Sequence, residues 1–179
     1  MDVIRLDLDR TEPDAPSEGE VRFQAAALAG IAATAASLIA RFVFDAPLVP
    51  ELLAHFIFAV VPIWMVEIAV GVLGPFAKHL AFLGCVVLYF LALLAAALLF
   101  LRYRATLGRA KALSSLALAL ILWAVTLTVV IPLLGGGLSG QYLRQGALYS
   151  AVLLFVVHLV YAAAIIIFSR LYLDGPAAT

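Results

Sequence analysis

Charged residues are scarce in this sequence of 179 residues. Asp, Glu, Lys and Arg together make up 12% of it, and 66% of the residues are apolar. Soluble domains average about 25% charged and about 45–50% apolar residues. A chain with so few charges cannot cover a surface of this size with polar groups, which excludes a water-soluble fold. The composition predicts a small integral membrane protein.

Cysteine and net charge are nearly absent as well. The one cysteine, Cys85, can form neither an internal disulfide nor a thiolate cluster for zinc or iron–sulfur. Eleven basic residues balance eleven acidic ones, so the chain has no net charge to attract nucleic acid. We therefore expect membrane lipid and other membrane subunits as partners, and no nucleic acid.

The sequence also lacks the motifs of catalysis and nucleotide binding. Ser114 and Ser115 have no His and Asp near them in the sequence, as a nucleophilic triad would need. The glycine-rich stretch 135–140 lacks the lysine of a phosphate-binding loop. We expect that the protein is not an enzyme.

The N-terminal segment differs from the rest of the chain. Residues 1–20 hold seven of the eleven acidic residues, together with two prolines. This composition is typical of an extended polar segment. We predict a polar acidic tail over residues 1–22, whose charge suits docking on a basic surface of a partner.

Beyond the tail the sequence contains five apolar stretches. Each is about as long as the ~20 residues that cross a ~30 Å hydrocarbon core as a helix. Because backbone groups in lipid must pair within their own segment, we predict helices. The fold class is therefore an all-α integral membrane protein, with a bundle of five transmembrane helices over residues 23–170 and a short tail over 171–179. The predicted spans are about 23–44, 52–73, 79–101, 112–134 and 147–169.

The predicted spans differ in side-chain size. Ala26, Gly30, Thr34 and Ser37 lie near one face of the first span. Small residues let helix backbones approach closely, so we expect this helix inside a bundle or against a partner. The third and fifth spans are bulky and suit contact with lipid or with another subunit.

Basic residues do not orient a chain of five spans. With the tail in the cytoplasm, five basic residues fall on the cytoplasmic side and six on the other, which decides nothing under the positive-inside rule. If the second segment, which contains Pro62, dips into the membrane and returns, the division becomes eight against three. The length of segment 52–73 favours a full crossing. We predict five spans, and the re-entrant alternative stays open.

Glu67 is the only acidic residue at membrane depth in these spans. An acid near the bilayer centre costs about 2.5–3.5 kcal/mol on the insertion scale. We therefore expect Glu67 to be neutral or paired and to face protein. Its role is either a proton relay or quinone contact, or a structural hydrogen bond between helices or subunits.

His158 lies almost at the midpoint of the fifth span. A neutral imidazole there can ligate a haem iron or a chlorophyll magnesium, hydrogen-bond Glu67, or play a structural part. His55 and His79 lie at other depths, which disfavours a haem held between two histidines. A single axial ligand is still possible, and the identity of any cofactor is left open.

Candidate partner-docking residues form two groups at the predicted membrane faces. The first group lies where the first two spans meet, and it either docks a partner or anchors the helix ends. The second group is the basic loop between the third and fourth spans, which contacts lipid head groups or an acidic partner. The residues are Arg41, Asp45, Glu51 and His55 in the first group, and Arg102, Arg104, Arg109 and Lys111 in the second.

The breaks between the spans carry a further pattern. Residues 50–53 read Pro-Glu-Leu-Leu, 73–78 read Leu-Gly-Pro-Phe-Ala-Lys, 82–84 read Phe-Leu-Gly, and 132–137 read Pro-Leu-Leu-Gly-Gly-Gly. Over residues 23–145 the chain thereby resembles the multi-span N-terminal membrane region that precedes a sulfite-oxidase-like molybdopterin domain in certain bacterial oxidoreductases. The resemblance implies a membrane anchor for a redox domain on the outer face.

The resemblance does not extend to a cofactor domain. Only residues 170–179 follow the last predicted span. No molybdopterin-binding residue is therefore carried over, and we expect a stand-alone relative of the anchor that is recruited into a larger membrane assembly.

These observations lead to three hypotheses about function. The first is a non-catalytic accessory or anchor subunit of a bacterial respiratory or photosynthetic electron-transfer complex, multi-pass in the inner membrane. The second is a cofactor-bearing subunit, holding pigment or haem, with His158 as an axial ligand. The third is a small transporter or proton channel centred on Glu67.

Overall fold

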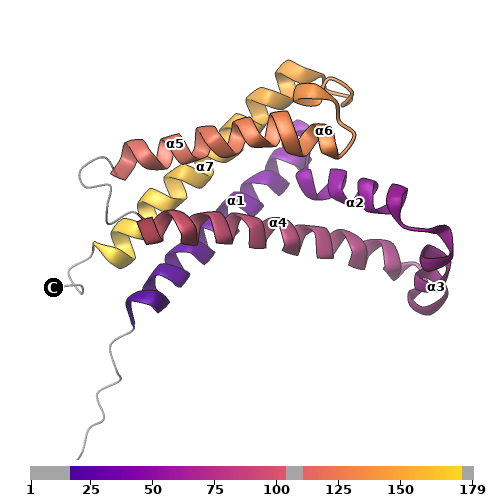
Figure 1. Ribbon diagram of the computed structural model, residues 1–179, viewed down its shortest axis with the longest axis horizontal. Coiled ribbons are helices and arrows are strands. Elements are labelled where there is room, and N and C mark those ends of the chain that lie inside the picture. The colour runs from indigo at the N-terminus through magenta and orange to yellow at the C-terminus, as the bar shows by residue number, and fades with distance from the viewer. Residues whose placement is uncertain (1–16, 104–110, 175–179) are drawn as a thin grey trace, which may run out of the picture.

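The computed structural model describes residues 17–103 and 111–174, and within these ranges every regular element is a helix. The predicted all-α fold is confirmed. Figure 1 shows the arrangement. The elements are α1 (Glu18–Phe44), α2 (Val49–Val60), α3 (Ile63–Leu73), α4 (Phe76–Tyr103), α5 (Lys111–Val125), the π-helix η2 (Thr126–Val130), α6 (Ile131–Leu133), the 3₁₀ helix η3 (Leu138–Gly140) and α7 (Ala147–Leu173).

Helix α1 begins earlier than the sequence analysis predicts. The side chain of Ser17 accepts a hydrogen bond from the backbone N–H of Glu20, and the Glu20 carboxylate accepts one from the backbone N–H of Ser17. This capping box satisfies two N–H groups at the helix start. The predicted tail boundary at residue 22 is therefore wrong, because the helix already begins at Glu18. Residues 1–16, with most of the acidic tail, lie outside the described part of the chain.

The second predicted span is not a straight helix. Helices α2 and α3 meet at Val61 and Pro62 with a bend of 115°. Val61 is extended, as residues before proline usually are, and Pro62 has no N–H to continue the α2 hydrogen bonds. Among the described residues four helices are long and apolar enough to cross a membrane, or up to five if the bent pair counts as one span.

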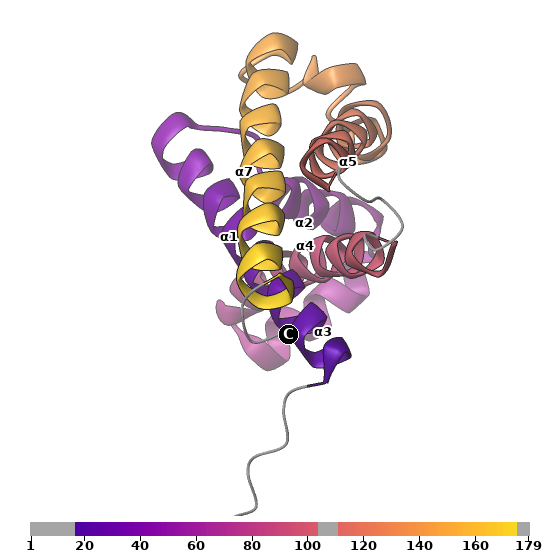
Figure 2. The ribbon, with the colours of Figure 1, turned by 90° about the vertical axis from the view of Figure 1, so that its left-hand side faces the viewer.

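The four long helices alternate in direction. The start of α1, the end of α4, the start of α5 and the end of α7 lie at one end of the molecule, on the left in Figure 1 and facing the viewer in Figure 2. Helix α4 packs on α1, α1 on α7 and α7 on α5, which gives the order α4, α1, α7, α5. Because α1 and α4 run in opposite directions, α2 and α3 together return the chain to the end where α1 stops.

The core forms around the small residues of α1. Six residues of this helix are buried, and all are Ala, Gly or Ser. At Gly30 an added Cβ would lie 3.0 Å from the Phe90 ring of α4, so only glycine allows this approach without movement. Of the predicted small-residue face, Ala26, Gly30 and Ser37 are buried and Thr34 is half-buried. The expectation that the first helix lies inside a bundle is confirmed.

Helix α7 occupies the centre of the molecule. Nine of its residues are buried, among them Leu154, His158, Tyr161 and Ile165. The buried side of the fifth span thus faces its own chain, while other bulky side chains of α7, such as Leu148, Val152 and Val156, are exposed and stay available for the expected contact with lipid or another subunit. The bulky α7 side chains pack against the small ones of α1 on one side and against α5 on the other.

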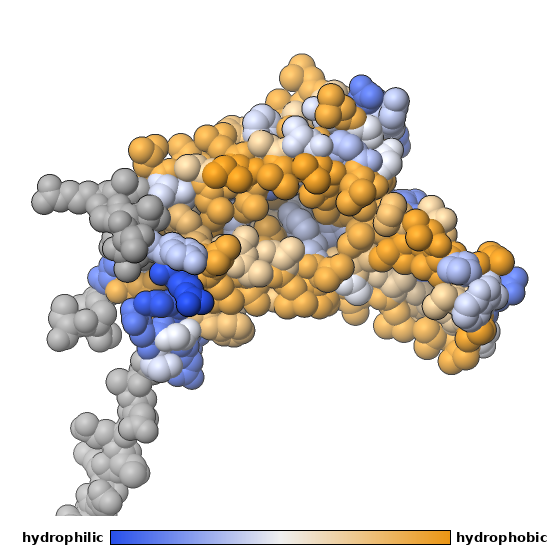
Figure 3. Space-filling model, in the orientation of Figure 1, coloured by the Kyte–Doolittle hydropathy of each residue, from blue (hydrophilic) through white to orange (hydrophobic). Residues whose placement is uncertain are grey.

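A different part of the molecule is apolar without being buried. We call residues 55–84, which include the second half of α2, all of α3 and the first turns of α4, the arm. None of these residues is buried. The arm runs from the end of α1 towards the right of Figure 1. Figure 3 shows a largely hydrophobic surface there, with hydrophilic residues at the tip and at the opposite end of the molecule.

Candidate functional site

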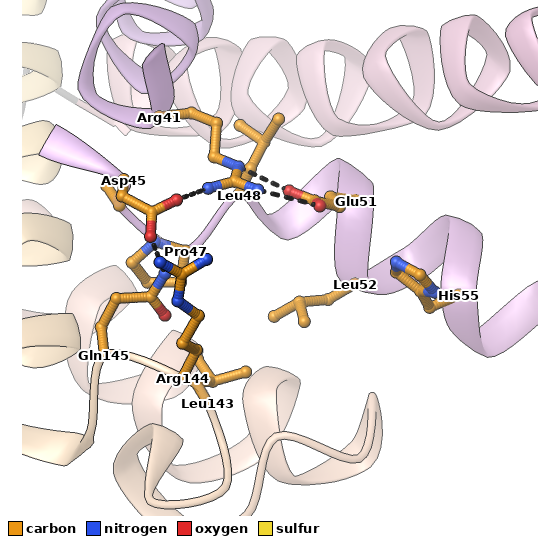
Figure 4. Close-up of a pocket in the computed structure, with 11 residues that line it drawn as sticks. Arg41, Asp45, Pro47, Leu48, Glu51, Leu52, His55, Leu143, Arg144 and Gln145 are labelled. Atoms are coloured by element: carbon orange, nitrogen blue, oxygen red, sulfur yellow. Dashed lines mark hydrogen bonds and ion pairs between the residues drawn. The ribbon is translucent and has the colours of Figure 1, made fainter. Parts of the chain in front are cut away.

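The end of α1 and the start of α2 are joined by a cluster of charged side chains. The guanidinium of Arg41 donates two hydrogen bonds to the Glu51 carboxylate, from Nε at 2.7 Å and from Nη2 at 3.1 Å. Its Nη1 donates to Asp45. Figure 4 shows Arg41 between the two carboxylates. A two-pronged Arg–carboxylate contact fixes the relative orientation of both groups, so α2 leaves α1 in a defined direction.

Asp45 links the same cluster to the start of α7. This residue ends α1 in the left-handed conformation, with φ 51°. The Gln145 side chain donates a hydrogen bond to Asp45 Oδ2 at 3.0 Å, and the Tyr149 hydroxyl donates to the Phe44 carbonyl at 2.6 Å. The hydrogen bond from Gln145, followed by the contact with Arg41, holds the pKa of Asp45 below its ordinary value. Asp45 is therefore a stable carboxylate that ties three segments together.

A pocket of about 180 Å³ opens beside this cluster. Its wall contains charged groups of both signs and several apolar side chains, drawn in Figure 4. The lining residues are Arg41, Asp45, Ala46, Pro47, Leu48, Glu51, Leu52, His55, Leu143, Arg144 and Gln145.

The structure brings together the first group of predicted docking residues. Arg41, Asp45, Glu51 and His55 all line the pocket. The sequence analysis missed Arg144 and Gln145, which lie about a hundred positions further along the chain. The local sequence shows only that both residues belong to a short polar run before the last apolar segment. It does not indicate that this run faces the end of α1.

One described member of the second group, Arg102, lies at the opposite end of the molecule. Arg102, near the end of α4, and Arg170, near the end of α7, are exposed there. At the same end the Arg22 guanidinium pairs with Glu18 at 2.5 Å. Two predicted members of the group, Arg104 and Arg109, lie outside the described residues, as does the side chain of Lys111.

His158 is held by hydrogen bonds inside the protein. Its Nδ1 lies 2.7 Å from the Leu154 carbonyl and can only donate to it, which leaves Nε2 as an acceptor. The hydroxyl of Thr126, in the π-helix η2, lies 3.4 Å from Nε2. A haem or chlorophyll metal would need that nitrogen, so an axial role requires the Thr126 contact to break. The geometry favours a structural histidine that links η2 to α7.

Glu67 does not face the other helices of its own chain, so the expected hydrogen bond between helices is not formed within the chain and a contact with another subunit stays a prediction. It is exposed on α3, a helix with no buried residue. Within the described residues no hydrogen bond or ion pair reaches it, and the His158 ring faces Leu154 and Thr126. The physical reason is the bend at Pro62, which turns α3 away from the four long helices.

The chain has no match among known proteins in three comparisons. No family model, no curated protein and no solved structure matches the chain.

Proposed function

We propose that the protein is a non-catalytic, membrane-embedded accessory or anchor subunit that packs against other membrane spans in a larger complex. The observation that carries this proposal is the arm. Its residues 55–84 are largely apolar, and none is buried within the chain. Trp64, Ile68 and Val72 are 57%, 58% and 78% exposed. An apolar surface of this length needs either lipid or a partner to cover it.

Glu67 favours a protein partner over lipid alone. It lies among the exposed apolar side chains of α3, where hydrocarbon would leave its carboxyl group without a hydrogen bond. Ionisable residues inside membranes pair with other polar groups because the unpaired state is costly. A hydrogen-bond donor on a partner helix would supply the missing contact. The proposed subunit therefore docks through the arm.

The inner part of the molecule supports a scaffold role. The Tyr161 hydroxyl donates to the Leu93 carbonyl at 2.5 Å, and Ser37 Oγ and Tyr89 Oη lie 3.2 Å apart. Together with the bonds of His158, these contacts use the polar groups of the core to join helices. They stabilise a fixed platform from which the arm extends.

The type of complex is proposed from the resemblance alone. A likeness to the membrane region of bacterial molybdopterin oxidoreductases suggests an electron-transfer assembly, respiratory or photosynthetic, in the inner membrane. The acidic tail, which lies outside the described residues except for its last few positions, suits docking on a basic surface of such an assembly.

The helix directions suggest an orientation. If α2 and α3 return the chain to the side where α1 ends, the order of the spans along the sequence assigns eight basic residues to the side where α1 begins and three to the other. The positive-inside rule then favours a cytoplasmic location for that end. The two sets are Arg5, Arg10, Arg22, Arg102, Arg104, Arg109, Lys111 and Arg170 against Arg41, Lys78 and Arg144.

Co-purification with site-specific crosslinking tests the proposal. The chain is isolated from its native membrane in mild detergent after a photoreactive amino acid has been placed at Trp64 in the arm. The control places it at Ile121 of α5, which is 60% exposed and lies outside the arm. We expect one membrane protein crosslinked from position 64 and recovered in fixed ratio, and no such product from position 121. Recovery of the chain alone, with only lipid crosslinked at position 64, would rule the proposal out.

A cysteine-accessibility assay tests the orientation separately. Gly19→Cys and Leu138→Cys, each made with Cys85→Ser, place a thiol at opposite ends of the molecule. A membrane-impermeant maleimide added to intact cells should label position 138 and leave position 19 unlabelled until the membrane is opened. The reverse pattern would invert the orientation, and labelling of both positions would contradict an even number of crossings.

A further inference from the structure

The walls of the pocket beside Arg41 are held together by bonds between side chains. Three segments form it: the end of α1, the start of α2 and the segment before α7. Arg41 joins the first two through Glu51, and Gln145 joins the third through Asp45. Because these bonds exist in the chain alone, the pocket is formed before any ligand arrives, and binding would not have to order it.

Some polar side chains of the pocket are bonded to one another, and two further donors are not. Arg41, Asp45 and Glu51 are bonded to one another, and Gln145 completes the Asp45 contact. Arg144 and His55 also line the pocket and are exposed. Within the described residues neither side chain has a hydrogen bond or a close ion pair, although the charge of Arg144 lies near enough to Asp45 to help lower the pKa of that carboxyl group. The donors available to a ligand are therefore a guanidinium and an imidazole, which suits an oxyanion such as phosphate.

The rest of the lining indicates an amphiphilic ligand. Ala46, Leu48, Leu52 and Leu143 give the pocket apolar surface next to Arg144. In Figure 4 the Leu52 side chain lies between the Arg144 side and the His55 side of the opening. A volume of about 180 Å³ is smaller than the roughly 300–1,000 Å³ of pockets that enclose a whole drug-sized ligand. It suits a head group whose chains stay outside, along the exposed apolar face of α2.

The position of the pocket fits the same ligand. It lies where α1 ends and α7 begins, at the polar boundary of two helices that are long and apolar enough to cross a membrane. The phosphate groups of phospholipids lie at that boundary, and basic pockets between membrane helices bind them.

We propose that this pocket binds the phosphate group of a membrane phospholipid, with Arg144 as its principal contact, His55 as a second donor and Leu48, Leu52 and Leu143 against the glycerol and first acyl carbons. The lipid would fill the gap between the base of the arm and the start of α7. The inference rests on the membrane location but requires no partner subunit, so a chain purified without any partner should still carry the lipid.

Phospholipid retention by the full chain in mild detergent tests this proposal. Arg144→Gln removes the principal contact, and Leu52→Trp fills the pocket with a larger side chain. Arg170→Gln is the matched control, because it removes another exposed arginine at the far end of α7. Native mass spectrometry measures the bound lipid. Unfolding temperature is then followed while phosphatidylglycerol, phosphatidylethanolamine or inorganic phosphate is added to delipidated protein.

We expect a tightly held phospholipid on the wild-type chain and on Arg170→Gln. Lipid affinity should fall on the order of tenfold or more in Arg144→Gln, since a charge-assisted hydrogen bond to phosphate is lost. Leu52→Trp should lose the lipid while keeping Arg144. Wild-type retention in both pocket variants would overturn the proposal, as would equal loss in Arg170→Gln. Equal stabilisation by inorganic phosphate would assign the site to a free anion instead of a lipid.

Discussion

Helix α1 and the arm are both apolar, yet the chain buries a row of residues on α1 and no residue of the arm. The buried residues of α1 are all small, and they let α4 and α7 approach on neighbouring faces. The arm carries large side chains, such as Trp64, Ile68 and Phe76, that stay on the outside. Hydropathy thus decides whether a segment leaves water. The pattern of side-chain size decides whether it packs within its own chain.

The two regions also treat their polar side chains differently. Ser37 on α1 bonds to the Ala33 carbonyl and lies beside Tyr89, so its hydroxyl is satisfied within the chain. Glu67 on α3 is exposed and, among the described residues, has no such contact. Among the described residues the buried hydroxyl of Ser150 also has no hydrogen bond, but it is enclosed by the chain, whereas the carboxyl group of Glu67 is open to a partner, as the proposed docking through the arm requires.

The largest expected effect separates two glycines, one on the small-residue face of α1 and one in the arm. Gly30→Leu forces a side chain against the Phe90 ring, which lies 3.0 Å from an added Cβ. Overpacking of this kind costs about 1–3 kcal/mol. Gly71→Leu on α3 meets nothing within 4 Å, and it replaces a poor helix former. Thermal unfolding in detergent should show a clear loss of stability for Gly30→Leu and a small change, of either sign, for Gly71→Leu.

The same pair of variants separates packing from docking. Gly71→Leu should fold normally in isolation, so any loss of partner in that variant belongs to the arm surface. Equal destabilisation by both substitutions would mean that the arm packs within the chain. The contrast between a packed α1 and an exposed arm would then be wrong.

The next effect concerns assembly and leaves folding intact. Glu67→Lys puts a positive charge opposite the hydrogen-bond donor that we propose on the partner. A lysine has no acceptor for that donor, so both groups would be left without a hydrogen bond at the interface, and recovery of the partner should fall on the order of tenfold or more. Glu67→Gln keeps a hydrogen-bonding side chain and should retain more partner. The measurement is the partner-to-chain ratio after purification, with the unfolding temperature of the isolated chain as the control.

An unchanged ratio in Glu67→Lys would show that Glu67 faces lipid or water. Glu67 would then no longer indicate a protein partner for the arm. The crosslink from position 64 would be the remaining test of that partner.

Much of the fold could be predicted from the sequence, because hydrocarbon leaves the backbone few choices. The first span, the fourth span and the small-residue face of α1 follow from apolar length and residue size. The bend at Pro62 was visible as an alternative. The length of segment 52–73 favoured a full crossing, yet a proline without an N–H breaks the helix there. The capping box at Ser17 could also have been predicted from the sequence.

The candidate site could be predicted only in part. Arg41 and Asp45 are four residues apart on one helix, and Glu51 follows within a short turn, so local spacing brings them together. Gln145 and Arg144 join them only because α7 returns along α1, and a long-range contact of this kind leaves no trace in local spacing. The exposure of Glu67 within its own chain could not be predicted, because membrane depth says nothing about which side of a helix that chain covers.

A smaller effect tests how the core joins its helices. Tyr161→Phe removes the hydroxyl that donates to the Leu93 carbonyl at 2.5 Å. Hydrogen bonds between membrane helices contribute about 0.6 kcal/mol on average, so the unfolding temperature should fall modestly. Tyr172→Phe, at an exposed position near the end of the same helix, is the control and should change nothing. Identical unfolding temperatures for both variants would mean that the Tyr161 hydrogen bond does not stabilise the core.

The smallest expected effect lies at the junction between α1 and the base of the arm, and it depends on pH. Asp45 has a pKa below its ordinary value of 3.8, because Gln145 and Arg41 stabilise the carboxylate. A lowered pKa in the folded state means that this contribution to stability is complete above pH 3.8 and is lost as the pH falls through the lower folded value. Amide hydrogen exchange over residues 45–52 should therefore accelerate, relative to α7, as the pH drops below about 4. Asp45→Asn tolerates the same left-handed backbone and cannot titrate, so it should exchange faster at neutral pH and show a weaker acid response. An equal acid response in both proteins would assign it to another group, and the link between arm and bundle would then rest on Arg41 and Glu51 alone.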